Sequence, residues 1–281
     1  GDVYKRQVQL SSDTRAGNWD ACSGYHYNDT TLKGFSHTHL SGTGCIDLGD
    51  ILFRPTTLKP DLTTESIYQP AAFSHKDEDA SAGYYSVVLK EEGIKAELTV
   101  TAHAGMHRYT FPSGKEASII IDLTHLLDNE YIYEAELEQT AANEITGMRR
   151  TRGWTDNQYV YFVAQFSKPF QAIDFIQNKK MVSAGVKLNG TDLQACLSFD
   201  NSNGEPVIAK VGLSIVSEKN ARENLETEVI GFDFDAVRSA ARSAWEQALS
   251  AITVKGGNTD DLKNFYTAMY HSMAVSYTHL R

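Results

Sequence analysis

The chain has 281 residues, which is enough for one large domain or two modest ones. Hydrophobic residues make up 41% of the chain and charged residues 22%, so it can bury a core and is not disordered by composition. A net charge of −10 argues against nucleic-acid binding, which needs a concentrated basic surface, and no apolar run approaches the roughly 20 residues of a membrane span.

Residues 1–6 (GDVYKR) are expected to be an artefact of gene assembly and are set aside. Site loops are predicted in the segment that follows. The segment 13–55 is rich in glycine, histidine and aromatic residues and has little periodicity. Polar and aromatic side chains in a glycine-rich backbone are typical of site loops held by a scaffold. Aromatic rings with Asp and His suit a sugar-binding pocket, because a pyranose has an apolar C–H face and a rim of hydroxyl groups.

The chain has three cysteines, Cys22, Cys45 and Cys196, which are too few for a disulfide framework. The sequence has no Cys-x-x-Cys pair, so a structural zinc site is disfavoured. Two interpretations stay open: a Cys22–Cys45 disulfide in an exported protein, or buried free thiols.

From residue 84 onward, strand patterns follow one another. Residues 84–89 are rich in β-forming residues, and apolar residues alternate with polar ones from 94 to 102. Short strands at about ten-residue spacing, separated by Gly, Asn, Asp and Ser, predict a mainly β fold, an antiparallel β-sandwich over 7–217. Further strands are expected at 107–111, 117–123, 131–139, 144–150, 159–166, 170–176, 185–188, 193–199 and 207–216.

The last quarter of the chain changes to a helical period. A short helix is expected at 220–229, and a longer amphipathic helix at 234–252. Gly256 and Gly257 end this pattern. We therefore expect a helical linker over 218–257.

A third helix is expected at 259–273, with Thr259 as its N-cap and a wide apolar stripe along one face. Such a stripe needs partners to cover it, and none is predicted downstream. We expect 258–275 to open a helical domain that continues in the natural protein. Residues 276–281 (SYTHLR) are interpreted as a second assembly artefact.

The run GFSHTHLSGTGC at 34–45, preceded by CSGYHY at 22–27, resembles glycoside hydrolase family 92. That family consists of bacterial calcium-dependent exo-acting α-mannosidases. The resemblance spans 8–275 and continues through 81–87 (SAGYYSV), 93–99 (GIKAELT), 107–112 (HRYTFP), 220–228 (NARENLETE), 245–249 (WEQAL) and 265–272 (FYTAMYHS).

The resemblance implies a β-sandwich, linking helices and an (α/α)6 barrel, with the active site between the two domains. It implies inversion at the anomeric carbon, with one carboxylic acid protonating the leaving oxygen and one carboxylate activating water. A calcium ion would contact the mannose hydroxyls and help to distort the ring. In this family the acid, the base and most calcium ligands come from the barrel. We therefore expect this chain to lack the catalytic carboxylates and to be inactive by itself.

The substrates implied by the resemblance are terminal α-mannosyl residues of glycans, and the implied location is the periplasm, the cell surface or the medium. A signal peptide would then lie outside this sequence. The determinants of linkage preference are expected in the barrel. The main partner of this chain would be its own C-terminal (α/α)6 domain.

The expected contribution of the N-terminal domain is one wall of the mannose pocket. Trp19 is the candidate for a ring that contacts the sugar, and a core or hinge aromatic is the alternative. Asp29 is a candidate acceptor for sugar hydroxyls, although Asn-Asp is also an ordinary turn pair. His37 and His39 would share a face of a strand and, with Ser41, are expected to shape the pocket through hydrogen bonds.

Several charged residues have structural interpretations that we favour. Asp47 and Asp50 (DLGD) mimic a glycosidase acid pair, but a structural pair that closes a loop is the preferred interpretation. Arg149, Arg150 and Arg152 form a basic run that is expected to be a solvated hairpin.

Two alternatives from other classes stay open. The first is a non-catalytic carbohydrate-binding β-sandwich, which the unpartnered apolar stripe at 262–273 disfavours. The second is a metal-dependent hydrolase that uses His26, His37 and His39, although a further ligand is not evident.

Overall fold

The computed structural model describes residues 8–17, 19, 22–40, 46–58, 69–128, 131–182 and 187–275. Both expected artefacts, at 1–6 and 276–281, lie outside the described residues. Ser41 and Cys45 lie outside them as well, and so does the first half of the strand expected at 185–188.

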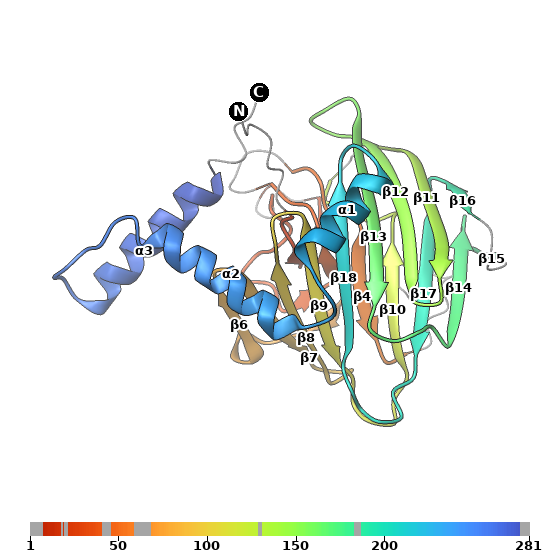
Figure 1. The fold of residues 1–281 in the computed structure, drawn as a ribbon, viewed down its shortest axis with the longest axis horizontal. Helices are drawn as coiled ribbons and strands as arrows, with labels where there is room; N and C mark the ends of the chain where they lie inside the picture. The colour runs from red at the N-terminus through yellow and green to blue at the C-terminus, as the bar shows by residue number, and fades with distance from the viewer. Residues whose placement is uncertain are drawn as a thin grey trace.

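Two antiparallel sheets form the body of the molecule (Figure 1). The seven-stranded sheet has the order β1 (Ser11–Asp13), β3 (Gly34–Ser36), β4 (Leu52–Thr56), β10 (Ala117–Asp122), β17 (Leu193–Phe199), β14 (Ala172–Gln177) and β15 (Lys180–Val182). The nine-stranded sheet has the order β16 (Leu188–Gly190), β11 (Tyr131–Ala141), β12 (Glu144–Arg152), β13 (Gln158–Phe166), β18 (Val207–Ser214), β9 (Ala104–Thr110), β8 (Ile94–Val100), β7 (Tyr84–Leu89) and β6 (Glu78–Ser81). The predicted β-sandwich is confirmed.

The core lies between the two sheets and follows from strand alternation. In β10, Ile119 and Ile121 point into the main core, where they join Phe162 of β13 in the other sheet. Ile120 points to the opposite face of β10 and packs against Ile176 and Cys196. β10 is a central strand that pairs with β4 on one side and with β17 on the other, and all six of its residues are buried. A continuous apolar run is the pattern expected for a strand that is covered on both faces.

The first eighty residues contain more regular structure than the sequence predicts. Besides β1, β3, β4 and β6, a two-stranded ribbon pairs β2 (Thr31–Leu32) with β5 (Ala71–Ala72), and a 3-10 turn covers His75–Asp77. These strands have two to five residues each. So short a strand has no measurable period, and only its pairing partner identifies it.

Three helices complete the chain: α1 (Glu218–Glu228), α2 (Phe234–Leu249) and α3 (Thr259–Val275). α1 begins two residues earlier than expected, because the Ser217 side chain accepts a hydrogen bond from the backbone N–H of Asn220 and caps the helix. Ala221 and Leu225 of α1 are buried against the outer face of the nine-stranded sheet. α2 ends at Leu249, three residues before the expected end.

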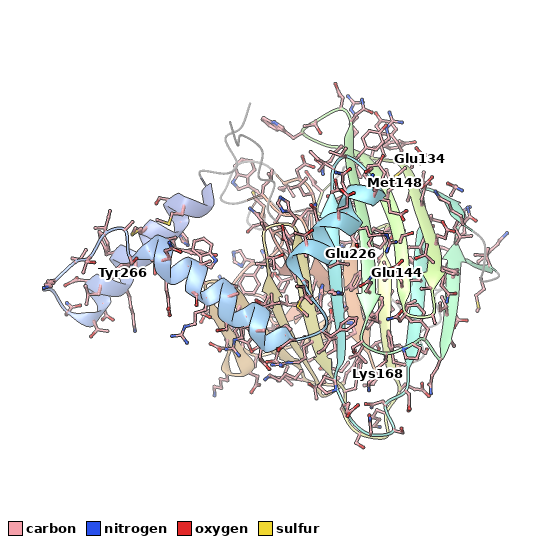
Figure 2. The ribbon with its side chains drawn as sticks, viewed as in Figure 1. Glu134, Glu144, Met148, Lys168, Glu226 and Tyr266 are labelled. Atoms are coloured by element: carbon pink, nitrogen blue, oxygen red, sulfur yellow. The ribbon has the colours of Figure 1, made fainter. Side chains whose placement is uncertain are left out.

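α2 packs against β7, β8 and β9 of the nine-stranded sheet, and α3 extends beyond the edge of that sheet (Figure 1). In α2, only Phe234 is buried among the described residues, and the rest of the expected apolar face is half-buried or exposed. Trp245 of α2 and Tyr270 of α3 contact each other, with ring centroids 4.7 Å apart. Figure 2 shows Tyr266 on α3, far from the sheets. Among the described residues, no helix is long and apolar enough to cross a membrane.

Candidate functional site

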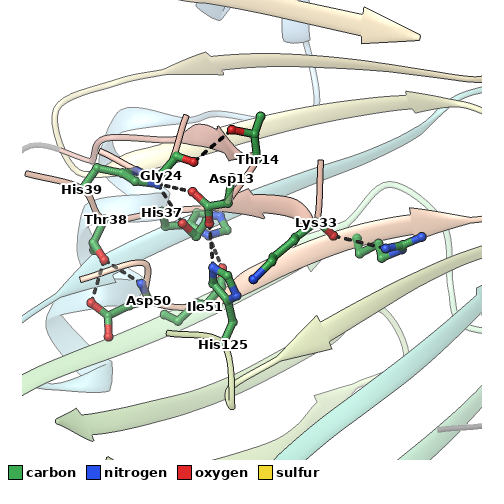
Figure 3. Close-up of polar contacts among 12 residues, drawn as sticks. Asp13, Thr14, Gly24, Lys33, His37, Thr38, His39, Asp50, Ile51 and His125 are labelled. Atoms are coloured by element: carbon green, nitrogen blue, oxygen red, sulfur yellow. Dashed lines mark hydrogen bonds and ion pairs between the residues drawn. The ribbon is translucent and has the colours of Figure 1, made fainter. Parts of the chain in front are cut away.

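The glycine-rich N-terminal segment is attached to the edge of the seven-stranded sheet through β1, β3 and β4. Behind it lies a layer of buried polar side chains, which Figure 3 shows. Buried polar groups must be hydrogen-bonded to be tolerated. The contacts of this layer therefore show which parts of the segment are fixed.

Asp13 lies between two histidine rings and is fully buried. Its Oδ1 is 2.7 Å from Nε2 of His39, and its Oδ2 is 2.9 Å from Nε2 of His125. Burial alone would raise the pKa of Asp13, but the two rings outweigh burial and hold this pKa well below its ordinary value. Burial likewise disfavours the charged form of His39, yet the Asp13 carboxylate raises the pKa of His39. The geometry favours an ion pair inside the protein.

His37 belongs to a second chain of hydrogen bonds, in which every ring is neutral. Its Nδ1 donates to the carbonyl oxygen of Ile51 at 2.7 Å, and its Nε2 lies 3.0 Å from Nε2 of His107. The hydroxyl of Tyr109 lies 2.7 Å from Nδ1 of His107 and donates to it. Burial lowers the pKa of His37 to about 4 and lowers the pKa of His107 well below its ordinary value. Neither ring has a nitrogen left for a ligand.

A buried ion pair fixes the other end of the loop. The Arg149 guanidinium contacts Oδ1 of Asp50 through Nε at 2.8 Å and through a terminal nitrogen at 2.7 Å, and both side chains are almost completely buried. The Thr38 hydroxyl donates to Oδ2 of Asp50 at 2.6 Å. The remaining Arg149 donors reach the carbonyl oxygens of Leu123 and His125.

The Asp50–Arg149 ion pair tests two predictions made from the sequence, one for each residue. Asp50 closes a loop, as expected. The prediction that Arg149 belongs to a solvated hairpin is wrong, because strand alternation directs it inward, where Asp50 compensates its charge. Arg150 and Arg152, on the opposite face of β12, are more exposed.

The backbone between these anchors is strained. Leu48 has φ +78° and Ile51 has φ +61°, on either side of Gly49 at φ +81°. A left-handed conformation is unfavourable for a non-glycine residue and most unusual for a β-branched one. Such conformations persist only where the surroundings impose them, and they cluster at functional sites.

Asp29 and Trp19 occupy the outer part of the segment. Both carboxylate oxygens of Asp29 contact the Arg15 guanidinium, and the hydrogen bond from Arg15 lowers the pKa of Asp29. Trp19 is 62% exposed, and its carbonyl oxygen lies 2.9 Å from Sγ of Cys22. The nearby Tyr27 is also exposed and stacks on the ring of His75 at 4.2 Å.

The structure separates the predicted site residues into two groups. His37 and His39 are buried in the polar layer, whereas Trp19 faces solvent and Asp29 is held by Arg15. Ser41 lies outside the described residues. Cys22 carries a free thiol, and its suggested partner Cys45 is not described.

No group of three or more His, Cys, Asp or Glu side chains in the described part of the chain could hold a metal ion. His26, the third member of the alternative histidine site, accepts a hydrogen bond from the backbone N–H of Asn28 through Nδ1. The described residues therefore do not form the metal site of that alternative.

Sequence reasoning missed His125 and Trp154. His125 lies 112 residues after Asp13 and has no motif around it, so only the fold reveals the pair. Trp154 is 79% exposed in the turn between β12 and β13. A lone tryptophan in a polar turn is a usable sequence signal, since burial is the ordinary fate of this residue.

Comparison with known proteins gives two family matches. Residues 7–214 match the glycosyl hydrolase family 92 N-terminal domain, and residues 220–279 match the glycosyl hydrolase family 92 catalytic domain. A curated protein of Arthroderma benhamiae, named an uncharacterized secreted glycosidase, is 30% identical over 89% of this chain and 36% of its own length.

Solved structures agree with these matches. The family GH92 α-mannosidase BT3965 of Bacteroides thetaiotaomicron is 38% identical, with a TM-score of 0.88 over 94% of this chain and 37% of that protein. BT3965 has also been solved in complex with mannoimidazole. The GH92 inverting mannosidase BT2199 of the same organism has the same fold at 23% identity, with a TM-score of 0.82 over 96% of this chain and 35% of its own.

The chain spans little more than a third of the length of these relatives. Within that span, the family match, the sandwich and the three following helices agree with one another. The chain belongs to glycosyl hydrolase family 92.

Proposed function

We propose that this chain is the N-terminal part of an inverting exo-α-mannosidase that removes terminal α-mannosyl residues from glycans. The observation that carries this proposal is the 38% identity to an α-mannosidase of known structure, which extends over 94% of the chain. The chain would supply the β-sandwich (7–217), the helical linker (218–257) and the opening of the (α/α)6 catalytic domain (258–275).

In this proposal the N-terminal segment forms one wall of the mannose pocket. Trp19 would place its indole against the C–H face of the sugar, because its ring is exposed while its loop is anchored. Asp29 would orient Arg15 or accept a sugar hydroxyl at the rim. His37 and His39 would act from behind the wall by holding the backbone that carries Ser41.

The reacting groups would lie in the rest of the protein. An inverting glycosidase needs two carboxyl groups on opposite faces of the sugar, separated by enough space for a water molecule. We place both of them, and most ligands of a calcium ion, beyond this chain. Bound calcium would supply charge that orients the mannose hydroxyls. The residues described here would position the sugar and exclude water from one side.

Export fits the same proposal, because the curated relative from Arthroderma benhamiae is named a secreted glycosidase. Mannosylated glycans outside the cytoplasm would then be the substrates. The location would be the periplasm, the cell surface or the medium.

The test is an assay of the whole protein and of this chain on α-mannosides, with and without a calcium chelator. We expect the whole protein to release mannose in a reaction that the chelator stops, and this chain to release none. Proton NMR of the first product should show β-mannose, as inversion requires. Release of α-mannose first, or no hydrolysis of any α-mannoside, would refute the proposal. Binding of mannosides by this chain alone would favour the carbohydrate-binding alternative.

A further inference from the structure

Trp154 combines an exposed ring with a fixed backbone. It lies in the turn between β12 and β13, and 79% of its surface is exposed to solvent. An indole ring is a large apolar surface that ordinarily becomes buried or joins a binding surface. The exposure of this side chain therefore needs an explanation that the sandwich itself does not supply.

The main chain of Trp154 is held from below by Asp47. The backbone N–H of Trp154 donates to Oδ2 of Asp47 at 2.8 Å, and Asp47 is buried. A Cβ at Gly153 would lie 2.2 Å from Oδ1 of Asp47, so that only glycine allows this approach. The other side of the same carboxylate accepts from the backbone N–H of Leu48 at 2.9 Å. The backbone of the turn is therefore fixed by Asp47, while the Trp154 ring is exposed to solvent.

The anchor of Trp154 belongs to the same assembly of loops as Trp19. Asp47 begins the strained segment that contains Gly49, and Gly49 packs so closely against Leu127 that a Cβ at Gly49 would lie 2.7 Å from Cγ of Leu127. The carbonyl oxygen of Leu127 accepts a hydrogen bond from the backbone N–H of Gly17, two residues before Trp19. The turn that carries Trp154 is therefore connected to the loop of Trp19 through Asp47, Gly49 and Leu127.

We propose that Trp154 is a second glycan-contacting residue, which stacks on the sugar that follows the terminal mannose on the leaving-group side. The inference rests on the proposed α-mannosidase function. An exo-acting enzyme encloses the terminal sugar and leaves the next one near the rim of the pocket. Because Trp154 is more exposed than Trp19, we assign Trp154 to the rim of the pocket and Trp19 to the terminal sugar. The C–H face of a pyranose is the complement of an indole ring.

The test uses the whole enzyme and two substrates that differ only on the leaving-group side. One is α-mannosyl fluoride, which has no second sugar, and the other is the α-linked mannobiose that the unmodified enzyme cleaves fastest. In Trp154→Ala, kcat/KM for mannobiose should fall at least about tenfold, whereas kcat/KM for the fluoride should fall far less. Trp154→Tyr should recover most of the loss, because it restores an aromatic face.

Two further variants make the comparison specific. Trp19→Ala should lower kcat/KM for both substrates, since its ring is assigned to the terminal mannose. Met181→Ala removes an equally exposed apolar side chain on β15, at the opposite edge of the seven-stranded sheet, and should change neither. Trp154→Ala should fold normally, because Asp47 holds the backbone of the turn and not the ring.

The outcomes separate the possibilities. Equal losses on both substrates, or a lower Tm for Trp154→Ala, would mean that the ring packs against the rest of the enzyme, and the inference would be wrong. Unchanged kinetics on mannobiose would also overturn it. If the unmodified enzyme hydrolyses neither substrate, the α-mannosidase proposal fails first, and the inference fails with it.

Discussion

Side chains are buried in the middle of the sandwich and also at its N-terminal edge, where β1, β3 and the loop before β4 lie. The two regions differ in the kind of side chain that is buried. In the middle, Ile119, Ile121 and Phe162 exclude water with apolar side chains on regular strands. At the edge, Asp50 and Arg149 are buried as charges, and the neighbouring backbone is left-handed. Apolar packing tolerates many similar solutions, whereas a buried ion pair is favourable in one geometry only. We infer that the edge gives up stability to fix one conformation of the glycine-rich segment.

The largest expected effect comes from breaking the buried ion pair. Arg149→Met keeps the volume of the side chain but leaves the Asp50 carboxylate buried without its counter-charge. We expect the free energy of unfolding to fall by about 3–5 kcal/mol, as measured by urea denaturation.

A matched control lies on the same strand. Arg152 forms a 3.4 Å pair with Asp156 in which both side chains are largely exposed. Arg152→Met should change the free energy of unfolding by less than about 0.5 kcal/mol. Similar losses in the two variants would show that the edge is not held by its buried charge.

A change in pH is expected to have an intermediate effect on the free energy of unfolding. His37 and His107 are buried and neutral, so between pH 6.5 and about 4 they take up protons in the unfolded chain and not in the folded one. Stability should therefore fall as the pH drops through this window, by about 3 kcal/mol for His37 alone. His39 has the opposite pH dependence, because its pKa is raised in the folded protein. The stability that it contributes is fully present below pH 6.5 and is lost as the pH rises through the pKa of the folded state.

Stability of the chain should thus be greatest near pH 6.5, as far as these histidines determine it. Urea denaturation at a series of pH values measures the curve. His37→Gln removes one titrating ring from the edge, and its stability should fall less steeply towards pH 4. An unchanged slope in that variant would contradict the assignment of a neutral His37.

The smallest expected effect comes from the strained backbone. Leu48 is half-buried at φ +78°, a conformation that costs a non-glycine residue about 1–2 kcal/mol and costs glycine almost nothing. Leu48→Gly should therefore leave the urea midpoint unchanged or raise it slightly. Ile121→Gly, in a regular buried strand, should lower the midpoint strongly. A large loss in Leu48→Gly would mean that its side chain matters more than its backbone strain.

Sequence alone predicts the middle of the molecule well. Alternation from residue 94 and the apolar run at 117–123 identify β8 and β10, because each strand is long enough to show a period. The family resemblance supplies the relation between sandwich and helices, and the matches to both family domains agree with it.

The edge is predicted poorly, for a physical reason. Asp50 and Arg149 are 99 residues apart, and each looks like a surface residue until the other is known. The same holds for Asp13 and His125. Short strands such as β1 and β3 are defined by pairing and not by their own residues. Local patterns carry no information about partners this distant.

The hydrogen-bond chain from Tyr109 through His107 and His37 to the Ile51 carbonyl offers a spectroscopic handle on the edge of the sandwich. Each ring N–H in it is buried and bonded, so its proton can exchange with solvent only when the two sheets part at that edge. In proton NMR, such hydrogens would persist as slowly exchanging ring signals. Their exchange rates would report how often the polar layer beneath the glycine-rich segment opens to solvent, independently of any ligand.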